Sequence, residues 1–153
     1  MARAPTDTCN HADTVNPLTD LGWLLATSYN RLVEQADRQL APLELTAAQY
    51  GVVMLLERGR ASTPSELCRL MDYDRGAMTR LLQRLKAKGV LTQVPNPKDR
   101  RAQTLKLTEK GRLLHQRARP ILDALHQQAL QGLNQDEAKA IAALLYRVIH
   151  NLS

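Results

Sequence analysis

The sequence predicts a mainly α-helical protein with one small β-hairpin, and three observations support this fold class. Apolar residues recur at helical spacing over most of the chain after residue 16. Side chains that can cap a helix stand directly before several of these apolar segments. Between Val90 and Leu107 the pattern instead becomes that of short strands, and Asn96-Pro97 interrupts it as a turn would.

The chain has 153 residues, of which 44% are hydrophobic, and is long enough to build one core. Polar residues such as Asp7 and Asp13 interrupt the N-terminal region, and no later stretch approaches the ~20 apolar residues of a membrane span. Cys9 and Cys68 are too few to suggest a disulfide framework, which fits a reducing compartment. We therefore expect a cytoplasmic protein without a membrane partner.

The first predicted helix follows a polar segment. Residues 1–15 show no periodicity, and we expect them to form a disordered tail. Asn16 can then cap a helix that has Pro17 at its first position. This helix, within residues 16–42, would be about 36 Å long, more than a small monomeric core needs. Part of it is therefore expected to pack on another chain. Its apolar positions are Leu18, Leu21, Leu25, Tyr29, Leu32, Ala36 and Leu40.

Later helix starts share one signature, a side-chain oxygen that can satisfy free backbone N–H groups. Gly59 and Gly89 are suited to end the helices that precede them. Thr108 can cap a long helix after the hairpin, and the last helix within residues 109–153 carries a broad apolar stripe. The four other predicted caps are Thr46, Thr63, Asp74 and Asn134.

The positive charge of the chain is concentrated in residues 75–106. This segment holds nine Lys or Arg and one acid, Asp99, a net charge of +8, whereas the whole chain has +6. The rest of the chain therefore has a net charge of −2. Such a concentration is typical of a polyanion-binding element. Aromatic residues make up only 3% of the chain, which disfavours single-stranded nucleic acids and leaves duplex DNA as the expected partner.

The order of the predicted elements, with a tight Asp72-Tyr73 turn between the third and fourth helices, indicates a helix-turn-helix followed by a wing in residues 43–108. On a helical wheel, residues 75–86 have one apolar face and one polar face. We expect the polar face to enter a major groove. It consists of Gly76, Thr79, Arg80, Gln83 and Lys86.

Two residues of the polar face can read bases. Arg80 can donate two hydrogen bonds to guanine, and Gln83 can both donate to and accept from adenine. Arg75 and Arg84 flank the face and are expected to meet phosphates. The alternative is an ordinary solvated helix face, but such a face mixes charge signs, and this helix has no acid.

The predicted tip of the hairpin holds one carboxylate among three cations: Lys98, Asp99, Arg100 and Arg101. A carboxylate is a poor contact for phosphate. Asp99 is better suited to orient a neighbouring guanidinium, so that the arginine enters a narrow minor groove in a fixed geometry. A solvated turn is the alternative.

The segment from Asp99 to Thr108 resembles the wing signature of the MarR family of bacterial transcription regulators. Arg84-Leu85 and Lys88–Leu91 are similar to the end of that family's recognition helix, and the resemblance covers about residues 17–152. It implies that Arg101 is the wing arginine that enters the minor groove, with Asp99 as its ionic partner. It also implies that the recognition helix extends from Asp74 to Lys88.

The resemblance further implies a homodimer. The helices of residues 16–42 and 109–153 would interlock with a second copy, so that two recognition helices read a palindromic operator. Gln93 departs from the pattern, because many members have an arginine shortly after the recognition helix. One phosphate contact of the family is therefore not assigned in this chain.

The family also implies a small-molecule input, often an aromatic acid or phenol. Five side chains could line such an effector pocket, although residues of these types at helical spacing can equally be core. They are Trp23, Tyr29, Tyr50, Met54 and His115. On this basis we expect a ligand-responsive repressor.

Three other functions compete with this hypothesis: an oxidant sensor, a protein-interaction module and an enzyme. Cys9 or Cys68 could sense oxidants, but Cys9 has no basic neighbour, and Cys68 beside Leu67 is expected to be a small buried residue. A winged helix used only for protein interaction would not need the concentrated positive charge. The sequence has no glycine-rich phosphate loop, nucleophile elbow or metal-ligand spacing, so we expect no enzyme activity, cofactor or metal.

Overall fold

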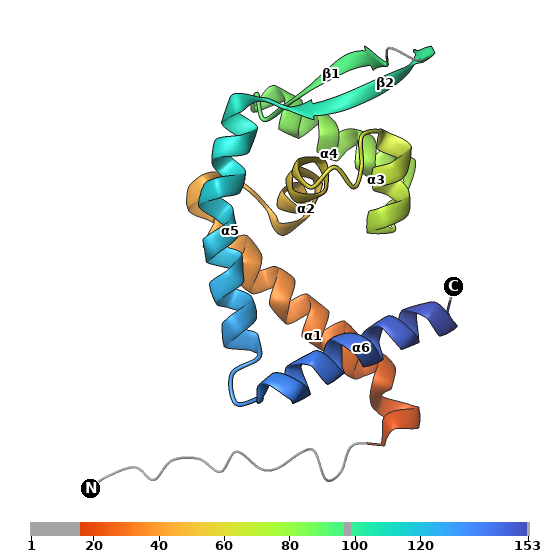
Figure 1. Ribbon diagram of the computed structural model, residues 1–153, viewed down its shortest axis with the longest axis vertical. Helices are drawn as coiled ribbons and strands as arrows, with labels where there is room; N and C mark the ends of the chain where they lie inside the picture. The colour runs from red at the N-terminus through yellow and green to blue at the C-terminus, as the bar shows by residue number, and fades with distance from the viewer. Residues whose placement is uncertain (1–15, 97–98, 153) are drawn as a thin grey trace, which may run out of the picture. The chain divides into compact units, whose positions relative to one another are not determined.

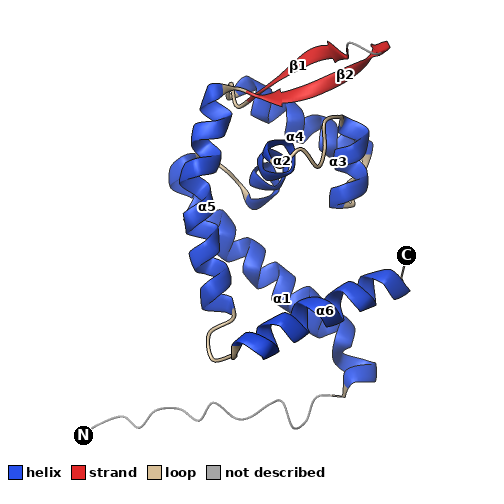
Figure 2. Cartoon of the chain, viewed as in Figure 1, coloured by secondary structure: helices blue, strands red, loops and turns tan. Residues whose placement is uncertain are grey.

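The computed structural model describes residues 16–96 and 99–152, and the side chains of residues 17, 18, 96 and 99–103 lie outside this description. The described elements are six α-helices, one 3-10 turn and one two-stranded antiparallel hairpin (Figures 1 and 2). This confirms the predicted fold class. In order, the elements are α1 (Pro17–Leu40), η2 (Ala41–Leu43), α2 (Ala47–Glu57), α3 (Pro64–Met71), α4 (Arg75–Ala87), β1 (Leu91–Asn96), β2 (Asp99–Leu107), α5 (Glu109–Ala129) and α6 (Gln135–Asn151).

Packing divides the chain into two units, and the boundary lies inside α1, between Glu34 and Gln35. The predicted division into dimerisation helices (residues 16–42 and 109–153) and a DNA-binding lobe (residues 43–108) stays a prediction. The last turns of α1 belong to the second unit. Ala36 and Leu40 are buried there, and the Asp37 carboxylate accepts a 2.6 Å hydrogen bond from the first backbone N–H of α2.

The core of the second unit is built around α2, which contacts α3, α4, α5 and β2. The hairpin extends beyond these helices (Figure 2). The apolar face predicted for α4 is confirmed, since four of its side chains are buried. The core side chains of α2, α4 and the hairpin include Val52, Val53, Met78, Leu81, Leu82, Leu85, Leu91, Leu105 and Leu107.

The predicted caps Thr46, Thr63, Asp74, Thr108 and Asn134 are confirmed, and the cap predicted at Asn16 stays a prediction. Three of the helices begin with reciprocal capping boxes, and the Asp74 side chain accepts from Ala77 N–H at 2.9 Å at the start of α4. Gly59 and Gly89 have φ of 62° and 68°, the left-handed conformation expected of residues that end helices. The boxes pair Thr46 with Gln49, Thr63 with Glu66 and Asn134 with Glu137.

The turn between α3 and α4 also lies where the sequence placed it. Asp72 has φ of 53° and ends α3, and its backbone N–H donates to the Cys68 carbonyl. Tyr73 N–H donates to the same carbonyl at 3.0 Å. The αL residue reverses the chain in one step, as helix C-termini commonly do. These bonds set the helix-turn-helix geometry that carries α4.

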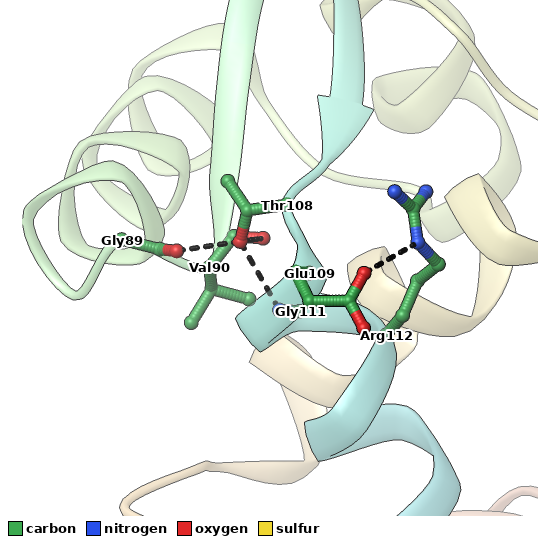
Figure 3. Close-up of polar contacts among 6 residues, drawn as sticks. All are labelled: Gly89, Val90, Thr108, Glu109, Gly111 and Arg112. Atoms are coloured by element: carbon green, nitrogen blue, oxygen red, sulfur yellow. Dashed lines mark hydrogen bonds and ion pairs between the residues drawn. The ribbon is translucent and has the colours of Figure 1, made fainter.

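The start of α5 is hydrogen-bonded to the residues that follow α4 (Figure 3). The Thr108 hydroxyl donates to the carbonyl oxygens of Gly89 (2.6 Å) and Val90 (3.1 Å), and Thr108 N–H also donates to Val90. The same hydroxyl oxygen accepts from Gly111 N–H at 3.1 Å, which caps α5. We call Gly89, Val90, Thr108 and Gly111 the α4–α5 junction.

Two helices expose apolar side chains. Within the described residues, α6 has no buried position, and Leu144 and Tyr146 are 54% and 73% exposed. In the first unit, α1 exposes 66% of Trp23 and 63% of Tyr29. A monomer rarely leaves apolar patches of this kind open to water. The prediction that these helices pack on another chain is consistent with this exposure.

We expect Gly111→Ala to destabilise the fold by about 2 kcal/mol or more. A Cβ at this position would lie 2.2 Å from the Val90 carbonyl oxygen, and a backbone atom of the junction cannot move aside cheaply. Urea unfolding followed by circular dichroism measures the effect.

The matched control is Gly22→Ala, because a Cβ at Gly22 has no neighbour within 4 Å and lies inside a helix. It should leave stability unchanged or raise it by up to about 1 kcal/mol. Equal stability of the two variants would contradict the tight contact at the junction.

Candidate nucleic-acid interface

The polar face predicted for the recognition helix is exposed in the structure. The α4 helix begins after its Asp74 cap and ends before Lys88, as the resemblance implied. It contains no acidic residue, and its opposite face is buried in the core. All of the α4 residues assigned to DNA are exposed: Arg75, Gly76, Thr79, Arg80, Gln83, Arg84 and Lys86.

The first turns of α4 show why a glycine suits position 76. A Cβ there would lie 3.5 Å from an Arg80 guanidinium nitrogen and 3.2 Å from an Asp74 carboxylate oxygen. The absence of a side chain leaves room for both groups and lets another molecule approach the backbone. Thr79 donates its hydroxyl hydrogen to the Arg75 carbonyl at 2.7 Å, so its oxygen can still accept.

One of the predicted contact residues has a partner inside the protein. Lys86 Nζ donates to the Gln93 side-chain oxygen, which ties the last turn of α4 to β1. Gln93 is the position that departs from the family pattern. An amide there can accept from a lysine, whereas an arginine could not. The departure therefore coincides with a contact that positions the wing.

The wing is an antiparallel hairpin whose register pairs Leu91 with Leu107 and Gln93 with Leu105, with an irregularity at Pro95/Asn96. This confirms the hairpin predicted between Val90 and Leu107. Lys98 lies outside the described residues, as do the side chains of Asp99, Arg100 and Arg101. The backbone of the last three belongs to β2. Their predicted roles at the tip stay predictions.

A hydrogen bond that sequence reasoning missed joins the wing to the helix-turn-helix. Leu105 N–H donates to the Ser62 carbonyl at 2.7 Å, on the segment that leads into α3. Glu66 fixes the same segment, because its carboxylate accepts from Ser62 N–H (2.7 Å), the Ser62 hydroxyl (3.1 Å) and Thr63 N–H (3.0 Å). The Thr63/Glu66 pattern predicted the cap, but no local pattern in the sequence marks the bond to β2.

The hydrogen bonds to Glu66 change its acidity. The backbone hydrogen bond from Ser62 is the largest cause that lowers the pKa of this carboxyl, and the other bonds from Ser62 and Thr63 act in the same direction. The ionised form is therefore the one that the folded protein stabilises. The stability that the ionised Glu66 carboxylate contributes is fully present above the pKa of this group in the unfolded chain. It is lost as the pH falls through the pKa of Glu66 in the folded protein.

The structure corrects the expectation for Cys68, which is half-buried rather than buried. Leu67 takes the core position of α3 and is fully buried. Cys68 instead lines a groove between α3 and α4 together with Arg75 and Met78. Cys9 lies outside the described residues. Oxidant sensing by either cysteine stays a prediction.

Two of the five side chains predicted for an effector pocket meet in the structure. The rings of Tyr50 and His115 stack with centroids 5.7 Å apart and planes 7° apart. Burial raises the pKa of Tyr50, and the nearby Asp123 adds to this rise. Met54 is half-buried on the same helix as Tyr50.

The other two predicted pocket residues, Trp23 and Tyr29, are exposed in the first unit. On the stacked pair, His115 Nδ1 is buried and has no hydrogen-bond partner among the described residues. A buried ring nitrogen without a partner is uncommon in native proteins.

The described part of the chain shows neither a metal-binding cluster nor a membrane-spanning helix. Among those residues, no group of three or more His, Cys, Asp or Glu is arranged to hold a metal ion. None of the described helices is both long and apolar enough to span a membrane.

Comparison with known proteins identifies relatives of the whole arrangement. The family model described as MarR family matches residues 43–102. The multiple antibiotic resistance protein MarR of Escherichia coli K12 is 32% identical over 139 residues, which cover 90% of this chain and 96% of that protein. The transcriptional repressor NicR of Pseudomonas putida is 29% identical and matches over 84% of this chain and 82% of its own length.

Solved structures give the same result. A cysteine-to-serine variant of E. coli MarR in complex with operator DNA matches with a TM-score of 0.79 and 33% identity, covering 87% of this chain and 96% of that one. BpsR of Bordetella bronchiseptica, whose DNA binding is regulated by 6-hydroxynicotinic acid, matches with a TM-score of 0.78 and 29% identity, covering 88% and 96%.

We expect Glu66→Ala to destabilise the protein by about 1 kcal/mol at pH 7, because three hydrogen bonds to the carboxylate are lost. The difference from wild type should shrink when urea unfolding is repeated at about pH 4, where the carboxyl of the unfolded chain begins to protonate. Glu57→Ala, at the exposed end of α2, is the control. A loss that is the same at both pH values would contradict the role given to the ionised carboxylate.

Proposed function

We propose that this chain, which belongs to the MarR family of winged-helix transcription regulators, is a ligand-responsive repressor that binds a palindromic operator as a homodimer. The observation that carries the proposal is the acid-free, exposed face of α4 at the end of a rigid helix-turn-helix. A helix of this kind can lie in the major groove of duplex DNA with its N-terminal turns against the base edges.

In this proposal the residues of α4 divide between bases and phosphates. Gly76 allows close approach, Arg80 donates to guanine, and Gln83 pairs with adenine, since these side chains match the edges of those bases. Arg75 and Arg84 flank the face and contact phosphates. Lys86 donates a hydrogen bond to Gln93 of β1, so it contacts the DNA backbone close to the wing.

The wing supplies a minor-groove contact. Arg101 enters the groove, and Asp99 orients it, as the family signature implies. Lys98 and Arg100 add positive charge at the tip. The hairpin supports this step. Its second strand, β2, begins at Asp99, and Leu91 pairs with Leu107 at the other end of the hairpin. A guanidinium in a narrow minor groove gains from the enhanced negative potential there.

Dimerisation would cover the apolar side chains that α1 and α6 expose. Two copies related by a two-fold axis present two α4 helices to successive major grooves, about 34–36 Å apart along the DNA. The operator must then carry two half-sites with the same symmetry. Operator binding by the related E. coli MarR supports the DNA partner.

A small aromatic or phenolic effector would act through the cluster around Tyr50, Met54 and His115. The support is the stacked pair with its unpartnered ring nitrogen, together with the regulation of BpsR by 6-hydroxynicotinic acid. Trp23 and Tyr29, the other two predicted pocket residues, lie in the first unit, and their role stays a prediction. An effector that favours one spacing of the two recognition helices shifts the equilibrium between bound and free DNA.

The first test is fluorescence anisotropy on DNA from upstream of the chain's own gene, over a salt series. Wild-type binding should weaken steeply with salt, because phosphate contacts release counterions. Arg101→Ala should lower affinity at least about tenfold by removing the minor-groove contact. Arg80→Ala should instead relax the preference at one base pair, worth about 1–3 kcal/mol.

Random duplex DNA of the same length is the control for sequence preference. Normal affinity in Arg101→Ala would refute the role of the wing. A uniform loss on all sequences in Arg80→Ala would make that residue a phosphate contact. Weak binding to both duplexes with no sequence preference would count against this DNA as an operator.

The dimer has its own prediction. Leu144→Glu places a charge on the exposed apolar face of α6 and should raise the dimer dissociation constant at least about tenfold, since burying an unpaired charge is costly. Analytical ultracentrifugation measures it. Lys139→Glu, an exposed polar position of the same helix, is the control and should leave the association unchanged. A monomeric wild-type protein at micromolar concentration would refute the dimer.

A further inference from the structure

A second cleft lies beside the α4–α5 junction. It encloses about 210 Å³ between the turn that follows α1, the end of α4 and the first half of α5. Tyr50, Met54 and His115 do not line it, so it is separate from the proposed effector cluster. Its apolar lining is aliphatic, and four charged side chains complete it. The lining residues are Pro42, Leu43, Leu45, Val90, Leu114, Glu44, Lys88, Lys110 and Arg117.

The cleft carries an excess of positive charge. Lys88, Lys110 and Arg117 provide three cations, and Glu44 provides the one carboxylate. Among the described residues, no ion pair joins any of these four groups to another charged side chain. A carboxylate ligand that enters would therefore meet three cations against the one carboxylate of Glu44. Hydrogen bonds between such charged partners are about twice as strong as neutral ones.

The lysine amines of the cleft have donors to spare. Lys88 Nζ donates to the Glu44 carbonyl and, at 3.3 Å, to the Gln49 side-chain oxygen. Lys110 Nζ donates to the Lys88 carbonyl at 2.8 Å. An ammonium has three N–H donors, so both groups keep at least one for a ligand. Arg117 is exposed and can offer its guanidinium fork.

The size and lining of the cleft set the class of ligand. Its volume corresponds to roughly seven water molecules, below the range of about 300–1,000 Å³ for drug-sized ligands. Inorganic phosphate would leave the aliphatic surface of Leu43 and Leu114 unused. We propose that the cleft binds a short-chain aliphatic carboxylate, with the carboxylate on Lys110 and Arg117 and the chain over these leucines.

Binding there would reach the recognition helix directly, a consequence that rests on the proposed function. Lys110 Nζ donates a hydrogen bond to the carbonyl of Lys88, and Lys88 is the first residue after α4. A carboxylate that binds a second N–H of this amine also attracts its charge toward the cleft, and this weakens the bond to the Lys88 carbonyl. The end of α4 then keeps its bonds through Thr108, Gln93 and Glu44, but it is held less firmly at the Lys88 carbonyl, and its orientation against DNA becomes less fixed. Occupation of the cleft should weaken operator binding.

The test uses the full chain labelled with ¹⁵N and titrated with hexanoate. We expect the amide signals of Lys88, Val90 and Gly111 to shift, and hexan-1-ol, which has the same chain without the charge, to leave them in place. Arg117→Gln should raise the dissociation constant of hexanoate at least about fivefold. Arg112→Gln is the matched control, since Arg112 lies on the same helix and pairs with Glu109 instead.

Operator anisotropy with and without hexanoate completes the experiment. Weaker operator binding in wild type but not in Arg117→Gln supports the whole proposal. Absence of the amide shifts, or equal hexanoate affinity in wild type and Arg117→Gln, overturns the site. Localised shifts with unchanged operator affinity overturn the coupling to DNA. Localised shifts in a protein that binds no operator leave the site standing and refute the proposed function instead.

Discussion

The carbonyl groups that follow α4 are the point on which the arrangement of the second unit depends. The last carbonyls of α4 accept from the backbone that follows them, since Lys88 N–H donates to Arg84 and Val90 N–H donates to Leu85, and the next carbonyls along the chain take donors from elsewhere. Here the donors come from the start of α5. Thr108 donates to the carbonyls of Gly89 and Val90, and Lys110 donates to the carbonyl of Lys88. Gly111 brings the two backbones into contact, because any side chain there would collide with Val90. The orientation of α4 is thus set by the helix that leads toward the proposed dimer interface.

In the proposed function, this attachment would give a physical route from ligand to operator. Coupling between sites requires an element whose arrangement both sites influence. The junction is such an element, since α5 carries His115 on one side and Lys110 and Arg117 toward the second cleft. A shift of α5 changes the donors available to the end of α4. No long chain of intermediates is needed, because the two helices share hydrogen bonds.

The cations of the basic segment have two different uses. Nine Lys or Arg between residues 75 and 106 indicated DNA binding by their number. The structure shows that Lys86 donates to Gln93 and that Lys88 donates to the turn before α2. Part of the positive charge therefore fastens α4 to its neighbours. A charge count therefore does not separate the cations that hold the fold together from those that are free for a partner.

The sequence by itself determined the elements of this protein and the polar face of α4 that the structure exposes. Caps such as Thr63 and Asp74, and the apolar spacing of α4, act over a few residues and are readable in one dimension. Only the tertiary structure decided which distant residues meet: Ser62 with Leu105, Lys88 with Glu44, and Thr108 with Gly89. It also placed Cys68, half-buried, at a groove, although its position beside Leu67 suggested the core. The physical reason is that these contacts depend on how helices and strands pack across the fold, which no local pattern records.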